Sequence, residues 1–165
     1  KNTGYAIIID DHIDKYGIIV NNNTNLSVRI YDTIKDIKSI IEKYNIKNIV
    51  LESIFLGYDP TVYMKLSMVI GAISLFCVGN NISLMTVSNP TWRSIYDISG
   101  GRSFCKAKSL KVAKEILNGK TICSNDISDA VCMAEYLLIS RGIHKNIYNI
   151  EYKIDTSNVE MNGFC

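Results

Sequence analysis

The spacing of apolar residues predicts a hairpin followed by a helix in the first third of the chain. Residues 5–9 and 13–20 are two apolar, β-branched runs, and the polar residues 10–12 between them read as a turn. Over residues 26–44 the apolar positions recur at steps of three and four, which is the period of one helical face. Asn45 ends this helix.

Strands and helices continue to alternate beyond this point. Residues 48–51 and 82–87 are short apolar runs typical of buried strands. The segments 59–77 and 89–96 open with Asp-Pro and Asn-Pro, an acceptor side chain followed by proline, which predicts a helix start in each.

Two further helices are expected in the last third of the chain. Residues 99–102 read as a loop, and a helical stripe covers residues 106–117. A second stripe runs to about Ser140 and is capped by Ser124 or Asn125. The whole order predicts an α/β domain with a mixed sheet flanked by helices.

Composition supports one globular domain. The chain has 165 residues, of which 47% are hydrophobic and 21% are charged. We find no signal segment, and apolar runs such as 68–79 look too short and interrupted to span a bilayer. A cytoplasmic protein without a membrane partner is therefore expected. The five cysteines form no C-x-x-C pair, so we interpret them as reduced packing or surface thiols.

Positive charge is concentrated in one part of the chain. Between Arg93 and Lys120 there are seven basic and two acidic residues, a local net charge of +5, whereas the whole chain carries +2. Such a field can hold a phosphate backbone. A solvated helix face is the alternative interpretation.

Three carboxylates stand out by their context. Glu52 follows the apolar strand 48–51, and Asp126 and Asp129 share one face at the start of the last helix. Convergent oxygens on stiff elements are what a hard divalent cation requires, and paired magnesium ions promote phosphodiester hydrolysis. The alternatives are a solvated glutamate and two aspartates that interact with the helix dipole.

Three segments resemble one family. Residues 2–6 (NTGYA), 49–55 (IVLESIF) and 124–130 (SNDISDA) are similar, in order and separation, to blocks of the RuvC-like Holliday junction resolvases. These enzymes belong to the RNase H-like nuclease superfamily. The Asn, Ile and Lys content resembles phage-type members. The resemblance implies a nuclease domain over residues 1–143 with an RNase H-like mixed sheet, and a C-terminal tail over residues 144–165.

The resemblance also implies site residues. Glu52, Asp126 and Asp129 match catalytic, metal-binding carboxylates, and Phe55 matches an aromatic that stacks on bases near the junction, with core packing as its alternative. The basic residues expected to contact DNA are Arg93, Arg102, Lys106, Lys108 and Lys111. Of these, Arg93 and Lys108 match family positions beside the scissile phosphate.

The implied activity is that of a magnesium-dependent, structure-selective endonuclease, with manganese as the alternative ion. It would cleave Holliday junctions or other branched DNA in recombination, repair or phage DNA processing and leave 5′-phosphates. We expect a homodimer, because a junction with two-fold symmetry calls for two active sites. The helix 60–77 would form part of the interface or be buried within the monomer. The expected location is the cytoplasm, which is the host cytoplasm for a phage protein.

The chain departs from the family pattern at its start. The family's first catalytic aspartate precedes the stretch that matches Thr3-Gly4, and the sequence begins at Lys1. Asp10 and Asp11 lie at the far end of the next strand, so we expect the natural protein to carry an additional N-terminal segment. Two alternatives stay open: an RNase H-like nuclease for hybrids or transposon ends, and a catalytically inactive module that binds branched DNA.

Overall fold

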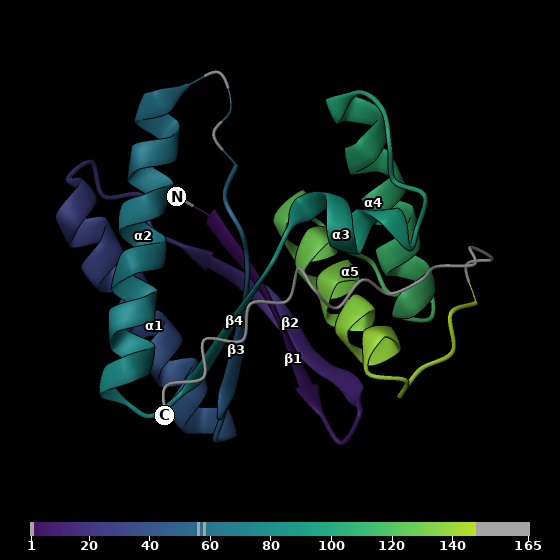
Figure 1. The fold of residues 1–165 in the computed structure, drawn as a ribbon, viewed down its shortest axis with the longest axis horizontal. Helices are drawn as coiled ribbons and strands as arrows, with labels where there is room; N and C mark the ends of the chain where they lie inside the picture. The colour runs from purple at the N-terminus through teal and green to yellow at the C-terminus, as the bar shows by residue number, and fades with distance from the viewer. Residues whose placement is uncertain (1, 56, 58, 148–165) are drawn as a thin grey trace. The chain divides into compact units, whose positions relative to one another are not determined.

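The order of the elements follows the sequence prediction. In the computed structural model, residues 2–55, 57 and 59–147 are described (Figure 1). The elements are β1 (Asn2–Ile9), β2 (His12–Val20), α1 (Leu26–Tyr44), β3 (Asn48–Glu52), α2 (Pro60–Gly79), β4 (Ser83–Val87), α3 (Asn89–Ser94), α4 (Arg102–Ile116) and α5 (Asn125–Ser140). The chain divides into two compact units. The first unit comprises the described residues between 21 and 89. The second unit comprises residues 2–20 and 90–147.

The first unit is built on a parallel pair of strands. β3 pairs with β4 in a register that sets Glu52 opposite Val87. α1 and α2 pack on each other, and α2 contacts β4. The core of this unit consists of Ile73, Cys77 and Ile82, and the apolar stripe of α1 packs against it.

The second unit is built on an antiparallel hairpin. β1 pairs with β2, and Asp10 and Asp11 in the turn have φ angles of 48° and 63°, the left-handed values that tight hairpin turns need. α5 packs on both strands and on α4. The interior is apolar and includes the fully buried Trp92 and Val131. The predicted hairpin and its turn are thus confirmed.

One glycine sets how closely the hairpin approaches α5. A Cβ atom built on Gly4 would overlap the backbone carbonyl of Asp126 and lie 2.9 Å from the backbone nitrogen of Ile127. Only glycine can let two backbones come this near. Gly4 therefore allows the first turn of α5, which carries Asp126, to pack directly against β1.

A histidine ties the far end of α5 to the hairpin turn. The ring Nδ1 of His144 lies 2.9 Å from a carboxylate oxygen of Glu135, and Nε2 lies 2.9 Å from the backbone oxygen of Asp11. Both partners only accept, so both nitrogens are satisfied only when the ring is protonated. The hydrogen bond to Glu135 accordingly raises the pKa of His144.

The helix caps follow the predicted residues, whereas the bounds of α2, α3 and α4 differ from the prediction. Asp59 accepts from the first backbone amides of α2, and the Ser124 side chain accepts from the Asp126 amide, 3.2 Å away. α4 begins at Arg102 instead of residue 106, because the extended backbone of Gly101 lets the helix begin without a side-chain cap.

α2 runs for 20 residues from Pro60 to Gly79, two residues beyond its predicted end. By length and composition alone it could cross a membrane, and only 11% of its apolar stretch is buried. The expectation that the apolar runs are too short for this is wrong, because the apolar stretch of α2 includes residues that precede the run 68–79. Ile73 and Cys77 give α2 a role in the core of the first unit.

The described strands form two two-stranded sheets, the antiparallel pair β1–β2 and the parallel pair β3–β4. The antiparallel and parallel pairings of the predicted mixed sheet are thus both present, one in each unit. The assignment of residues 1–143 to one nuclease domain stays a prediction. Most of the predicted tail, residues 148–165, lies outside the described residues.

Candidate active site

Two of the three predicted carboxylates share the first turns of α5. Asp126 is exposed, and Asp129 is partly buried. Ser124 caps the helix directly before them. The charge of Asp126 contributes to a raised pKa of Asp129, which agrees with the predicted common face of the helix.

Asp129 lies at the centre of a polar cluster from three helices. Its carboxylate is 3.6 Å from a terminal guanidinium nitrogen of Arg93, which belongs to α3 and stacks at 5.1 Å on Trp92. Ser109 of α4 is fully buried beside it. Burial raises the pKa of Asp129, and Ser109, Arg93 and Lys106 oppose this shift only in part.

Three buried polar atoms of this cluster lack a hydrogen-bond partner of good geometry within the described residues. They are Arg93 Nε, Ser109 Oγ and Asp129 Oδ1. The serine hydroxyl still lies close enough to the carboxylate to lower its pKa. An unsatisfied buried polar group costs about 1–3 kcal/mol, so such a group is normally retained for a reason. A carboxylate oxygen in this state, next to a second carboxylate, fits a hard divalent cation.

The third predicted carboxylate, Glu52, belongs to the first unit. It ends β3, and the neighbouring strand β4 ends at Val87 in the same register. The carboxyl ends of parallel strands meet at one edge of a sheet, which brings Asn89 to Glu52. The amide of Asn89 donates to a carboxylate oxygen of Glu52. The exposed glutamate is thus held in one orientation at the strand end.

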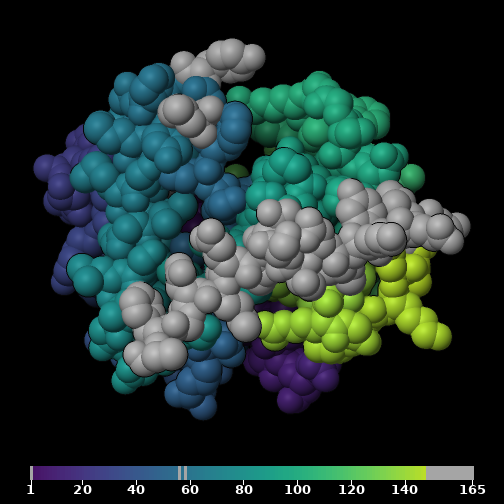
Figure 2. Space-filling view, in the orientation of Figure 1, coloured from purple at the N-terminus to yellow at the C-terminus, as the bar shows by residue number. Residues whose placement is uncertain are grey.

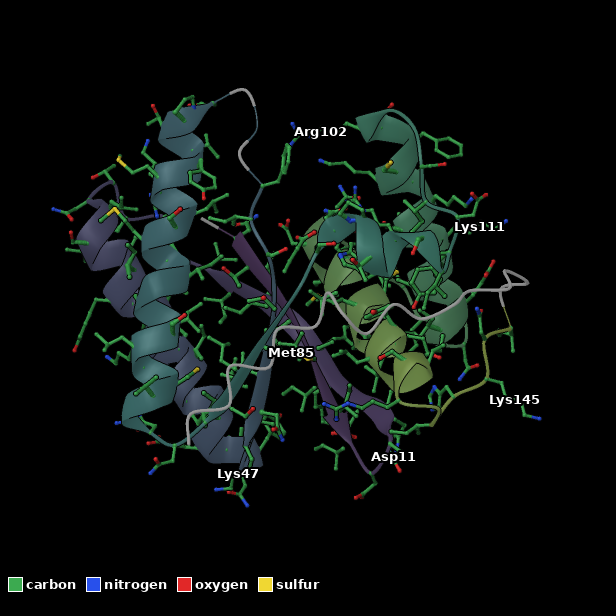
Figure 3. The ribbon with its side chains drawn as sticks, in the orientation of Figure 1. Asp11, Lys47, Met85, Arg102, Lys111 and Lys145 are labelled. Carbon is green, nitrogen blue, oxygen red and sulfur yellow. The ribbon has the colours of Figure 1, made fainter. Side chains whose placement is uncertain are left out.

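The basic residues predicted to contact DNA have different surroundings. Lys108 donates to the backbone oxygen of Asp97 and forms an ion pair with its carboxylate at 3.0 Å. Arg93 is engaged with Asp129, as described above. The exposed ones are Arg102, Lys106 and Lys111. Figure 3 shows Arg102 and Lys111 extending from α4 in different directions, whereas the face of the helix that carries Cys105 and Ser109 is buried.

Phe55 is 87% exposed, in the segment directly after Glu52. The alternative that it packs in the core is therefore wrong. Its contact with DNA stays a prediction.

Residues 2–55, 57 and 59–147 contain no group of three or more His, Cys, Asp or Glu side chains arranged to hold a metal. The predicted ligands are divided between the units, with Glu52 in one and the two aspartates in the other. That these three carboxylates bind metal together stays a prediction.

Sequence reasoning missed Ser109 and Asn89. Ser109 occupies a core position of α4, where a small polar residue among apolar neighbours was the available signal. Asn89 directly follows Ser88 at the end of β4, and the parallel pairing of β4 with β3 could have suggested its contact with Glu52.

The structure describes four of the five cysteines, and Cys165 lies outside the described residues. Cys77, Cys105 and Cys132 are buried and Cys123 is exposed, and all four are free thiols. Burial and the nearby charge of Asp129 raise the pKa of Cys132, so its thiol stays protonated. The interpretation of these four as packing or surface thiols is confirmed.

Carboxylates beside an arginine, next to a basic helix on an α/β scaffold, are an arrangement that metal-assisted phosphodiester cleavage can use. A family model described as crossover junction endodeoxyribonuclease RuvC matches residues 1–135. The chain belongs to this family. The predicted family and the predicted enzyme class, an endodeoxyribonuclease, are confirmed, and members of the family generally depend on divalent metal.

Curated relatives and solved structures agree with this assignment. The chain is 28% identical to the RuvC of Helicobacter pylori strain 26695 over 141 residues, which are 81% of this chain and 87% of that protein. It is 29% identical to the RuvC of Helicobacter hepaticus over 141 residues, 81% of this chain and 75% of the relative. A structure described as T. thermophilus RuvC in complex with Holliday junction substrate matches with a TM-score of 0.65 and 10% identity, over 79% of this chain and 80% of the other. That match confirms the predicted RNase H-like α/β fold.

Proposed function

We propose that this protein is a magnesium-dependent endonuclease that cleaves Holliday junctions or other branched DNA. The observation that carries the proposal is the cluster of Asp129, Arg93 and Ser109 in a chain of the RuvC family, in which the buried Oδ1 atom of Asp129 has no hydrogen-bond partner of good geometry within the described residues. Manganese is the alternative ion.

Glu52, Asp126 and Asp129 would hold the metal. When bound, a divalent cation supplies charge neutralisation and a lower pKa for water. The carboxylates bind and orient it, and Arg93 holds Asp129 in place through the contact at 3.6 Å. Water attacks the phosphorus, the bond to the 3′ oxygen breaks, and that oxygen takes up a proton. The products are a 5′-phosphate and a 3′-hydroxyl.

The basic residues would hold the DNA backbone. Arg102, Lys106 and Lys111 are exposed on α4, which carries five basic residues and one acidic residue. Each lysine or arginine that contacts a phosphate displaces a counterion and adds salt-dependent affinity. Lys108 is positioned by Asp97 and can reach a phosphate only by leaving that ion pair. We therefore expect Lys108 to contribute less to DNA affinity than the exposed basic residues.

We also propose a homodimer with α2 in its interface. One face of α2 packs in the core through Ile73 and Cys77, so the alternative of burial within the monomer holds for that face only. Other apolar positions on α2 are exposed, with Leu75 at 75% and Met64 at 54%. A second copy would cover them, and a dimer supplies the two active sites that a two-fold junction requires.

The location that goes with this function is the cytoplasm, or the host cytoplasm for a phage protein, where branched DNA arises. Processing of recombination or repair intermediates, or of phage DNA, is the corresponding role.

The test is cleavage of labelled substrates by the purified chain carrying its natural N-terminus. A four-way junction, a flap, a linear duplex and an RNA–DNA hybrid are incubated with Mg²⁺ or Mn²⁺, and binding is measured separately in Ca²⁺. We expect cleavage of the junction or the flap, with the duplex and the hybrid intact. Preferred cleavage of the hybrid would assign another RNase H-like substrate. Junction binding without any cleavage would identify an inactive binding module.

A further inference from the structure

An aromatic side chain lies among the cations of α4. Phe104, in the first turn of that helix, is 56% exposed. The Nζ atom of Lys108, one turn further, lies 5.9 Å from the centroid of the ring, within the range of a cation–π contact. Figure 2 shows part of α4 in green at the surface of the second unit.

The ring lies near a loop glycine. A Cβ atom built on Gly100 would reach ordinary contact distance of a ring carbon of Phe104, 3.6 Å, so the glycine leaves space beside the ring. Gly100 has a φ of 111°, which side chains rarely adopt. Lys108 forms an ion pair with Asp97 at 3.0 Å. The cation beside the ring is therefore held in place before any ligand binds.

Phe104 and two lysines form one stripe along the helix. Phe104, Lys108 and Lys111 are spaced by four and three residues, so they share a face, with Glu115 at its far end. The opposite face of α4 is buried through Cys105, Ser109 and two apolar neighbours. A partner of the stripe must accept an aromatic surface and positive charge together.

Nucleotides with an exposed base face meet both requirements. A base offers a π-face that stacks on an aromatic ring whatever its identity, and its phosphates pair with flanking cations. In a linear duplex every base already stacks on its neighbours, so the ring would have no base to receive. A branch point interrupts this stacking and exposes base faces, so a ring on a basic helix favours branched over linear DNA.

We propose that Phe104 stacks on an exposed base at the branch point, while Lys111 holds an adjacent phosphate and Lys108, which is paired with Asp97, contributes less to this contact. This stripe is distinct from Phe55, which belongs to the first unit. The inference rests on the proposed function, because it names the feature by which that nuclease distinguishes a branch from a duplex.

The experiment measures the binding of a four-way junction and of a linear duplex with the same sequences, in Ca²⁺, by the full chain. Phe104→Ala weakens junction binding about 5- to 150-fold, the range for loss of one stacked base, and changes duplex binding less than 2-fold. Phe104→Trp retains junction affinity, and Phe104→Leu, which keeps apolar bulk without a ring, behaves like the alanine variant. Lys111→Gln lowers the salt dependence by about one ion on both DNAs.

Tyr31→Ala is the matched control, because Tyr31 is an aromatic of α1 with 69% exposure. It should bind both DNAs like the wild type. Full junction affinity in Phe104→Ala, rescue by Phe104→Leu, or an equal loss on junction and duplex would each overturn the inference. Loss of dimerisation in Phe104→Ala, seen by sedimentation with junction affinity kept, would overturn it in favour of a protein interface.

The two proposals fail in different ways. A wild-type chain that neither prefers nor cleaves junctions removes the proposed function, and the stacking role with it. A wild type that cleaves junctions, together with an unaffected Phe104→Ala variant, removes the stacking role alone.

Discussion

Gly4 is the residue at which the smallest change should have the largest structural effect. Gly4→Ala adds one methyl group where β1 meets the first turn of α5. That methyl would overlap the carbonyl of Asp126 and lie 2.9 Å from the nitrogen of Ile127. Both obstacles are backbone atoms, so no side chain can rotate away, and β1 or α5 has to move.

The cost can be bounded from the general behaviour of overpacked interiors. Inserting a methyl group into a close-packed contact costs about 1–3 kcal/mol. For a chain of this size, about 2–4 °C of melting temperature are lost per kcal/mol, so we expect a decrease of roughly 2–12 °C. The first turn of α5 carries Asp126, and a displacement of about 1 Å at a catalytic group can reduce a rate about 100-fold.

The assay combines thermal and urea unfolding, both followed by far-UV circular dichroism, with junction cleavage at saturating substrate. Gly79→Ala is the control, because a Cβ atom at Gly79 in α2 would meet nothing within 4 Å. It should be neutral or stabilising by up to about 1 kcal/mol, the gain of alanine over glycine in a helix. Wild-type stability and cleavage in Gly4→Ala would refute the close approach of β1 to α5.

Three further predictions concern other parts of the chain. His144→Gln removes the link to Glu135 and destabilises the fold. Because the pairing with Glu135 raises the pKa of His144, the loss of stability is full below about pH 6.5, the pKa of a free histidine. The loss becomes smaller as the pH rises through the pKa of His144 in the folded state. Urea midpoints between pH 5 and 9 test this, and a pH-independent difference would contradict it. Arg93→Gln lowers cleavage more than junction binding in Ca²⁺, because Arg93 acts on Asp129, and an equal loss of both would argue against that role. Leu75→Lys shifts the chain toward monomer in sedimentation with unchanged helix content, and an unaltered dimer would exclude this part of α2 from the interface.

The local structure could largely be predicted from the sequence. The turn at Asp10-Asp11 and the caps at Asp59 and Ser124 depend on backbone groups a few residues away, which a linear pattern records. The start of α4 at Arg102 could not be predicted, because Gly101 is typical of a loop and carries no capping side chain.

The surroundings of the carboxylates could be predicted only in part. Asp126 and Asp129 were found because one helical turn separates them in the sequence. The contacts of Asp129 with Arg93 and of His144 with Asp11 join residues that are 36 and 133 positions apart, and no periodicity links such residues. Tertiary packing alone decides these pairs.

The central claim is that the carboxylates carry the cleavage chemistry, and junction cleavage by Glu52→Gln in Mg²⁺ tests it most directly. Glu42→Gln is the control, because Glu42 is an exposed glutamate of α1 whose carboxylate lies 3.7 Å from the ammonium group of Lys38. We predict that Glu52→Gln binds the junction in Ca²⁺ within a few-fold of the wild type and cleaves it at least about 100-fold more slowly, more than the usual loss for a residue that merely supports a metal ligand. Cleavage by Glu52→Gln at the rate of Glu42→Gln would contradict the account.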